Sequence, residues 1–156
     1  MYGPAAAVGE IDAALYSLLR ALKQTHLRDY LQAQAGVELD QAGLAALYAL
    51  HTAEASLRLT ELAELLRIDA PAVTRKAQQL ERAGLVSRTR DELDARATRL
   101  QLTPEGNQMI NNFLAARRAW IATLLDDWTD AEQAEFASLL RRFNDDVQRH
   151  VKELPS

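Results

Sequence analysis

The stretch IDAPAVTRKAQQLERAGLV, residues 68–86, carries side chains that can read the edges of DNA base pairs. Its apolar residues form one narrow helical line, and the rest of its surface is Thr, Arg, Lys and Gln. The major groove of DNA is about 12 Å wide and admits one helix, whose Arg can bind guanine and whose Gln can bind adenine through two hydrogen bonds each. The residue types therefore fit a helix that contacts a duplex.

Six residues near the start of this helix are candidate DNA contacts. Small side chains in the first turn allow a close approach, and Arg75, one turn further along, is long enough to reach a base edge. The alternative for such a polar stretch is a solvated face that binds nothing. The candidates are Pro71, Ala72, Thr74, Arg75, Lys76 and Gln79.

A second basic cluster lies between residues 88 and 99, where four arginines surround three acidic residues. One interpretation is a surface network of ion pairs with little energetic weight. The other is that Asp94 orients Arg96 into the minor groove, because a narrow A·T-rich groove concentrates negative potential. This second interpretation makes Arg88, Arg90, Asp94 and Arg96 the candidate contacts of the segment.

The sequence around these residues predicts helices joined by short connections, with one hairpin. Alternating residues between 86 and 102 predict a two-stranded hairpin with one buried face. Helical spacing is found over residues 10–34, 41–53, 61–68, 70–83, 104–128 and from 130 onward.

The predicted helices of the middle segment begin at residues whose side chains accept hydrogen bonds from first-turn N–H groups. These N-caps are Asp40, Thr60, Asp69 and Thr103, and Gly84 is expected just after the helix that starts at Asp69. A short helix, a tight break, a second helix and a hairpin together form a helix-turn-helix with a wing.

The segment LTELAELLRIDAPAVTRKAQQLERAGLVSRTRDELDARATRLQLTPEG, residues 59–106, resembles the winged helix-turn-helix of the MarR family, the multiple antibiotic resistance regulators. The matching features are the Thr-Arg pair, LERAGLVSR, D-x-x-D-x-R at 91–96 and LTPEG. The resemblance implies a homodimer, responsive to a ligand in many members, that usually represses genes near its operator. It also implies that Thr74 and Arg75 contact bases or phosphates, and that Arg96 enters the minor groove with Asp94 as its partner.

The predicted fold class is mainly α with a small β-hairpin wing, a winged helix-turn-helix flanked by N- and C-terminal dimerisation helices. Residues 1–38 would form the N-terminal dimerisation helix and residues 39–103 the DNA-binding domain. Residues 104–156 would form the C-terminal dimerisation helices.

The terminal helices carry more apolar residues than one winged lobe needs to cover, which favours pairing with a second copy. Obligate homodimer interfaces often bury ~2,000 Å² or more. A two-fold dimer would place two recognition helices about 34 Å apart, one turn of DNA, and would therefore select a pseudo-palindromic operator. A monomeric helical bundle is the alternative.

The resemblance further implies a small aromatic or anionic effector, bound where the winged lobe meets the dimerisation helices. Tyr16, Tyr48 and His51 lie on helices that could line such a space, although ordinary packing explains each of them as well. The three histidines form no recognisable metal motif, so no metal and no cofactor are expected.

Composition excludes several classes of protein. The 156 residues include no cysteine, which excludes disulfides and thiol chemistry. No apolar run approaches the ~20 residues of a membrane span, and the first residues lack the features of a signal peptide, so we expect a cytoplasmic protein without membrane contact. The net charge is −4, yet residues 55–100 carry nine Lys/Arg against seven Asp/Glu, a local charge of +2.

No nucleophile–base pair, phosphate loop or metal set is found in the sequence, so an enzyme is not expected. The leading hypothesis is a homodimeric, sequence-specific DNA-binding transcription regulator, a repressor released by a small-molecule ligand. The alternative is a winged-helix protein-interaction module that does not bind DNA. Binding to a duplex with a strong salt dependence would separate the two.

Overall fold

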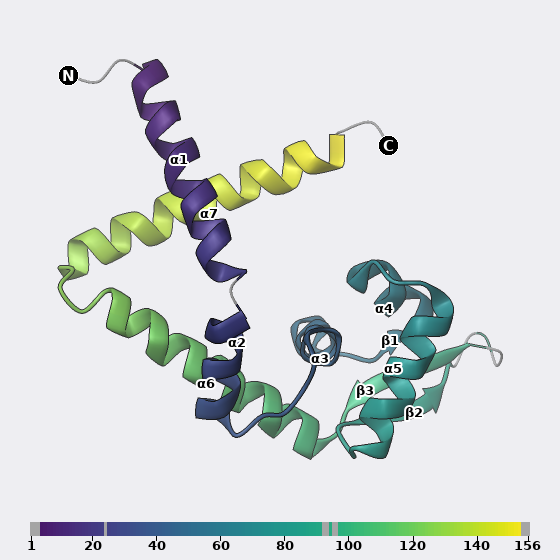
Figure 1. The fold of residues 1–156 in the computed structure, drawn as a ribbon. Coiled ribbons are helices and arrows are strands. Elements are labelled where there is room, and N and C mark those ends of the chain that lie inside the picture. The colour runs from purple at the N-terminus through teal and green to yellow at the C-terminus, as the bar shows by residue number, and fades with distance from the viewer. Residues whose placement is uncertain (1–3, 24, 92–93, 95–96, 154–156) are drawn as a thin grey trace. The chain divides into compact units, whose positions relative to one another are not determined.

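The structure is a computed structural model that describes residues 4–23, 25–91, 94 and 97–153. Within these ranges the chain forms seven helices and three short strands (Figure 1). They are α1 (Pro4–Leu22), α2 (Thr25–Ala35), α3 (Gln41–Ala53), β1 (Leu57–Arg58), α4 (Leu59–Leu66), α5 (Ala70–Arg82), β2 (Val86–Arg90), β3 (Thr98–Leu102), α6 (Pro104–Leu124) and α7 (Asp130–Glu153). The chain divides into two compact units, Met1–Arg117 and Arg118–Ser156.

The predicted helix-turn-helix is formed by α4 and α5. Asp69 caps α5 by accepting a hydrogen bond from the N–H of Ala72 at 2.7 Å, and Gly84 follows the helix with a φ of 73°. Both features were predicted and are confirmed. Glycine suits the position after the helix because a positive φ is strained for residues with a side chain.

The prediction that Thr60 caps α4 is wrong. The helix begins earlier, with Arg58 in the N-cap position, and Thr60 lies inside it. The backbone N–H of Arg58 donates to the Glu61 carboxylate at 2.6 Å. A carboxylate in the first turn is a stronger acceptor than a hydroxyl and also interacts favourably with the helix dipole, which explains the earlier start.

The wing is a three-stranded antiparallel sheet with the strand order β1-β3-β2, so the prediction of two strands is one strand short. Strands β2 and β3 pair from Val86↔Leu102 to Arg90↔Thr98, as a hairpin requires. The added strand β1 pairs with β3 through Leu57↔Leu100. Two residues are too few to show an alternating pattern, which explains why β1 was not predicted. The predicted fold class, mainly helical with a small wing, is confirmed.

The terminal helices differ from the prediction in two places. The single helix expected over residues 10–34 is two helices, because α1 ends at Leu22 and α2 begins at Thr25. The segment KQTH interrupts the apolar spacing there, and threonine favours helix starts over helix interiors. The helix expected to reach residue 128 ends at Leu124. Beyond it, the Leu125 N–H donates to the Ala122 carbonyl oxygen at 3.1 Å, which closes a tighter turn.

The core of the winged lobe joins α3, α4, α5, β3 and α6. Side chains from these five elements are removed from water almost completely, and their burial holds α5 against the sheet. The largest of them are Leu47, Leu62, Leu80, Leu100, Ile110 and Val73.

A close junction connects the end of α5 to the start of α6. Thr103 caps α6 as predicted, because its hydroxyl accepts from Gly106 N–H at 3.0 Å. The same hydroxyl donates to the Gly84 carbonyl at 2.6 Å, and Thr103 N–H donates to the Leu85 carbonyl at 3.1 Å. A Cβ at position 106 would lie 1.9 Å from the Leu85 carbonyl oxygen, so only glycine fits.

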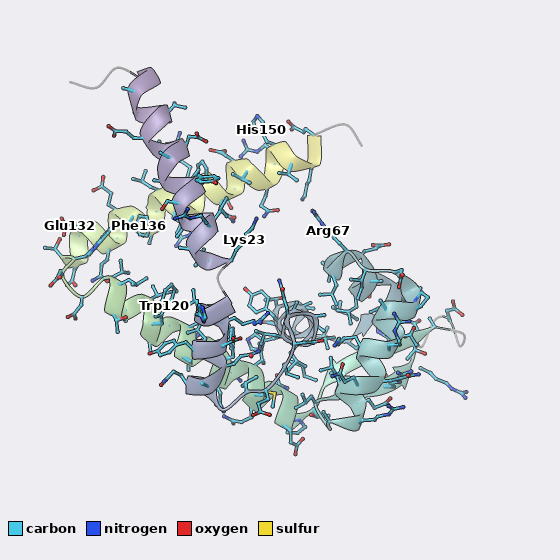
Figure 2. All side chains as sticks on the ribbon, in the orientation of Figure 1. Lys23, Arg67, Trp120, Glu132, Phe136 and His150 are labelled. Atoms are coloured by element: carbon cyan, nitrogen blue, oxygen red, sulfur yellow. The ribbon has the colours of Figure 1, made fainter. Side chains whose placement is uncertain are left out.

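The unit formed by Arg118–Ser156 holds the last turns of α6 and the whole of α7. Thr129 and Glu132 form a capping box, with Thr129 N–H donating to the Glu132 carboxylate at 2.8 Å, a bond that lowers the pKa of Glu132. The ring centroids of Trp128 and Phe136 lie 5.3 Å apart (Figure 2 labels Phe136 and Glu132). No residue of α7 is buried.

Candidate nucleic-acid interface

The inner face of α5 is narrow and completely covered. Val73, Ala77 and Leu80 are each at most 1 % exposed, and they follow one another at helical spacing. Because this line fixes the rotation of the helix about its axis, the polar side chains between these residues must point away from the core. The sequence-based orientation of the helix is therefore confirmed.

Arg75 is the most available of the candidate contacts on α5. Its side chain is exposed and forms no hydrogen bond or ion pair with any residue that the structure describes. Gln78, one turn from Thr74, is exposed as well. Both side chains are free to bind an outside group without first breaking a bond within the protein.

Lys76 is engaged inside the protein. Its Nζ lies 2.5 Å from Asp40 Oδ2 and 2.7 Å from Gln79 Oε1, and its side chain is only 12 % exposed. Asp40 in turn caps α3 by accepting from Gly43 N–H at 2.8 Å, which confirms the predicted cap. The hydrogen bond from Lys76 lowers the pKa of Asp40, so the pair stays charged and connects α5 to the start of α3. Lys76 and Gln79 stay predicted contacts, but each already has a partner.

The remaining candidates of α5 lie in its first two turns. Pro71 is exposed, and Ala72 is half-buried with its N–H bound to Asp69. The Thr74 hydroxyl donates to the Ala70 carbonyl at 2.8 Å, so its oxygen still has a lone pair that can accept a bond from outside. The structure thus brings Pro71, Thr74 and Arg75 to the outer face of the same helix end.

The wing places its candidates in different environments. Arg88 lies on β2 with its Nε 2.8 Å from Glu81 Oε2, which connects the sheet to the last turn of α5. Arg90 and Asp94 are exposed, and Asp94 N–H donates to Asp91 Oδ1 at 3.1 Å. Arg96 lies outside the described residues.

Two residues at the base of the wing, Arg58 and Asp91, were not among the candidates. The Asp91 carboxylate is 2 % exposed and binds the guanidinium groups of Arg58 and Arg99. The hydrogen bonds that Arg58 donates to Asp91 raise the pKa of Arg58 above its usual value. Arg58 precedes Asp91 by 33 residues, so no local pattern could have paired them.

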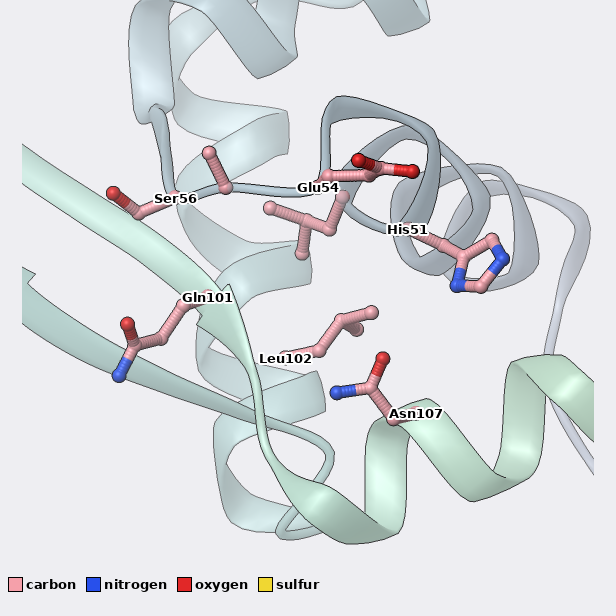
Figure 3. Close-up of a pocket in the computed structure, with 8 residues that line it drawn as sticks. His51, Glu54, Ser56, Gln101, Leu102 and Asn107 are labelled. Atoms are coloured by element: carbon pink, nitrogen blue, oxygen red, sulfur yellow. The ribbon is translucent and has the colours of Figure 1, made fainter.

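The residues predicted for an effector do not share one cavity. His51 lines a cavity of about 370 Å³ at the C-terminal end of α3, whereas Tyr16 and Tyr48, both described, are not among its lining residues (Figure 3). The Arg117 guanidinium lies 5.5 Å from the centre of the Tyr48 ring. Tyr16 is 70 % exposed. The cavity is lined by Leu50, His51, Glu54, Ala55, Ser56, Gln101, Leu102 and Asn107.

The winged lobe is similar to known proteins. Residues 39–98, from before α3 to the start of β3, match the model of the MarR family. The winged helix-turn-helix of this chain is therefore similar to that of the MarR family. The match covers the capped α3, the helix-turn-helix and the strands β1 and β2, and these elements include the helix that carries the candidate DNA contacts of α5.

Three relatives extend this comparison. The HTH-type transcriptional repressor MdtR of Bacillus subtilis is 32 % identical over 98 residues, which is 63 % of this chain and 63 % of MdtR. The YusO protein of Bacillus subtilis is 28 % identical, with a TM-score of 0.67 over 92 % of this chain and 99 % of YusO. The PcaV transcriptional regulator of Streptomyces coelicolor, solved in complex with its natural ligand, is 29 % identical, with a TM-score of 0.55 over 82 % of this chain and 89 % of PcaV.

The alignment with MdtR therefore spans less than two thirds of that repressor. MdtR and PcaV are named as transcription regulators rather than enzymes, in agreement with the sequence-based expectation for this chain. No helix in the described ranges is long and apolar enough to cross a membrane. Within the same ranges, no group of three His, Asp or Glu side chains is placed to hold a metal ion.

Proposed function

We propose that this protein is a regulator of the MarR type, a homodimeric, sequence-specific DNA-binding transcription regulator that acts as a repressor in the cytoplasm. The observation that carries the proposal is the orientation of α5, whose apolar line is fully buried while Arg75 and Gln78 face outward beside Thr74. A helix of this kind has the width and the donors that the major groove requires. The name of MdtR supports the repressor role.

Homodimer formation is proposed from the apolar stripe of α7. Six large apolar residues on this helix are between 39 % and 55 % exposed although they recur at helical spacing. A second copy would cover such a stripe on both chains at once through a two-fold axis. The stripe consists of Phe136, Leu139, Leu140, Phe143, Val147 and Val151.

The test is selection of bound duplexes from a random pool, followed by titration of the selected duplex at several salt concentrations. We expect a pseudo-palindromic sequence with half-sites one DNA turn apart and a log–log salt slope of several units. If no duplex is enriched and no slope appears at low salt, the winged-helix protein-interaction module becomes the better explanation.

Release by a small effector is proposed as a second property, since PcaV was solved with its natural ligand. The described chain offers two places for it. Exposed Tyr48 beside Arg117 combines an aromatic ring with a cation and suits an aromatic anion. The cavity at His51 carries the Glu54 carboxylate and no Lys or Arg among its described lining residues, so it suits a neutral or cationic molecule.

The two places are separable by variants. Aromatic carboxylates are the probe, and release of the selected duplex is the measurement. We expect Tyr48→Ala to abolish release and His51→Ala to leave it unchanged. The reverse result would assign the effector to the cavity, and no release from the wild type by any probe would contradict the effector proposal.

A further inference from the structure

Asp91 is the only charged residue that is buried among those that the structure describes. It lies directly after β2, at the point where the chain leaves the sheet, and its side chain is 2 % exposed. Removing a carboxylate from water costs several kcal/mol unless hydrogen bonds and opposite charges replace the lost solvation. The groups that surround Asp91 must therefore be held in place around it.

Donors from three different segments meet on this carboxylate. Arg58 on β1 binds it with two prongs, Nε to Oδ2 at 2.7 Å and Nη2 to Oδ1 at 3.0 Å. Arg99 on β3 donates from Nη1 to Oδ2 at 2.8 Å, and the backbone N–H of Asp94 donates to Oδ1 at 3.1 Å. Two-pronged arginine bonds fix direction as well as distance.

The same segments are joined by bonds that do not involve the carboxylate. Arg99 Nε donates to the Ser56 hydroxyl at 2.8 Å, and its Nη2 donates to the Ser56 carbonyl at 2.6 Å. Asp91 N–H donates to the Ala97 carbonyl at 3.1 Å, and Ala97 N–H donates to the Asp94 carbonyl at 2.9 Å. The base of the wing is thus closed by one network that runs from Ser56 before β1 to the turn after β2.

We propose that Asp91 is the positioning residue of the wing. Its carboxylate sets the direction in which the chain leaves β2, and thereby the approach of the wing to DNA. Asp91 itself does not touch DNA, because it is buried and carries the charge that phosphates repel. The inference rests on the proposed DNA binding, and it adds a role for a residue that carries the wrong charge for a contact.

The sign of the effect separates positioning from simple electrostatics. Asp91→Asn keeps the shape of the side chain and removes one negative charge, so charge alone predicts equal or tighter binding to any duplex. If Asp91 positions the wing, the affinity for the selected duplex should instead fall by about tenfold or more. This is the size expected when one good groove contact is lost. Binding to a random duplex should not fall, because unspecific phosphate contacts do not need a fixed wing.

Two variants serve as controls. Glu64→Gln removes one exposed negative charge from α4, outside the network, and measures the effect of charge alone. Arg58→Lys keeps the net charge but loses the two-pronged bond, so we expect a smaller loss than with Asp91→Asn. It also keeps the test informative if Asp91→Asn does not fold.

Hydrogen exchange without DNA provides a readout that does not depend on the proposed function. We expect the amides of Asp91 and Ala97, which are bonded at the wing base, to exchange faster in Arg58→Lys and Asp91→Asn, while amides of α3 and α5 keep their wild-type rates. Unchanged exchange at the wing base, or binding of the selected duplex as tight as that of Glu64→Gln, overturns the inference. If the wild type binds no duplex, the proposed function fails, and the exchange rates alone decide whether Asp91 positions the wing.

Discussion

Helices α5 and α7 are both amphipathic, but the apolar face of α5 is buried and that of α7 is exposed. The line Val73, Ala77 and Leu80 on α5 is at most 1 % exposed, whereas α7 has no buried residue at all. Helical spacing predicted an apolar face on each helix correctly. It contains no information about what covers that face, because the covering surface comes from other segments or from another molecule.

The largest effect is expected when the apolar face of α7 is made charged. Phe143→Asp places a carboxylate in the stripe that we propose to be covered by a second copy, so the dimer should dissociate. DNA affinity should then fall by about 10²-fold or more, because the two half-sites are no longer bound together. Sedimentation at micromolar concentration and duplex titration measure the two effects. Ser138→Asp, on the opposite side of α7, is the control, and a dimer that survives Phe143→Asp would contradict the proposed interface.

The apolar face of α5 should respond through folding instead of assembly. Leu80→Ala removes a side chain that is 1 % exposed, and we expect it to lower the free energy of unfolding by about 2–5 kcal/mol. Urea unfolding measures the loss. Leu65→Ala, at a side chain that is 62 % exposed on α4, is the control and should change stability far less. Equal losses in the two variants would mean that α5 is not anchored by its apolar line.

The polar face of α5 should respond through DNA binding alone. Arg75→Ala removes an exposed guanidinium without a partner among the described residues, so stability should stay close to that of the wild type. Binding of the selected duplex should weaken by ~1–3 kcal/mol, with relaxed preference at one base pair, if Arg75 binds a base edge. Titration against duplexes altered at single positions is the measurement. A uniform loss on all of them would restrict Arg75 to phosphate contact.

The smallest effect is expected from the ion pair that joins α5 to α3. Asp40→Asn keeps an oxygen for the cap and removes the charge that pairs with Lys76, and because Asp40 is well exposed the cost should stay below about 1 kcal/mol. The pKa of Asp40 is lowered in the folded protein, so its contribution is present above the unfolded pKa and is lost as the pH falls through the folded pKa.

Urea unfolding at pH 7 and near pH 2 checks this sign. The difference between wild type and Asp40→Asn should shrink at the acidic pH. The exposed Glu38, beside the same cap, provides Glu38→Gln as a control for loss of charge alone. A difference that grows on acidification would show that the ion pair does not stabilise the fold.

Much of the winged lobe was predictable because its signals are local. Asp40, Asp69 and Thr103 cap helices within three residues of themselves, and Gly84 takes the positive φ that few other residues accept. Thr60 shows the limit of such signals. The helix could start at the Thr60 hydroxyl or at the Glu61 carboxylate, and it starts where the carboxylate accepts the Arg58 N–H.

The parts that escaped prediction depend on contacts between distant segments. Strand β1 exists because β3 offers it a free edge, and its two residues carry no pattern of their own. Arg58 and Asp91 are bonded across 33 positions, and in the sequence Asp91 is only one of three acidic residues among the arginines of residues 88–99. Lys76 was predicted as a DNA contact from its neighbours on α5, and its bond to Asp40 appears only when α3 is placed beside that helix.

The sequence by itself determined which segments are helices, where most of them begin, and which face of α5 turns outward, since spacing and capping act within a few residues. Only the tertiary structure decided that Asp91 is buried between two arginines and that Lys76 is already paired. It also decided that the apolar face of α5 is covered while that of α7 is not. The physical reason is that burial and ion pairing depend on which distant side chains come into contact, and those contacts exist only in the folded chain.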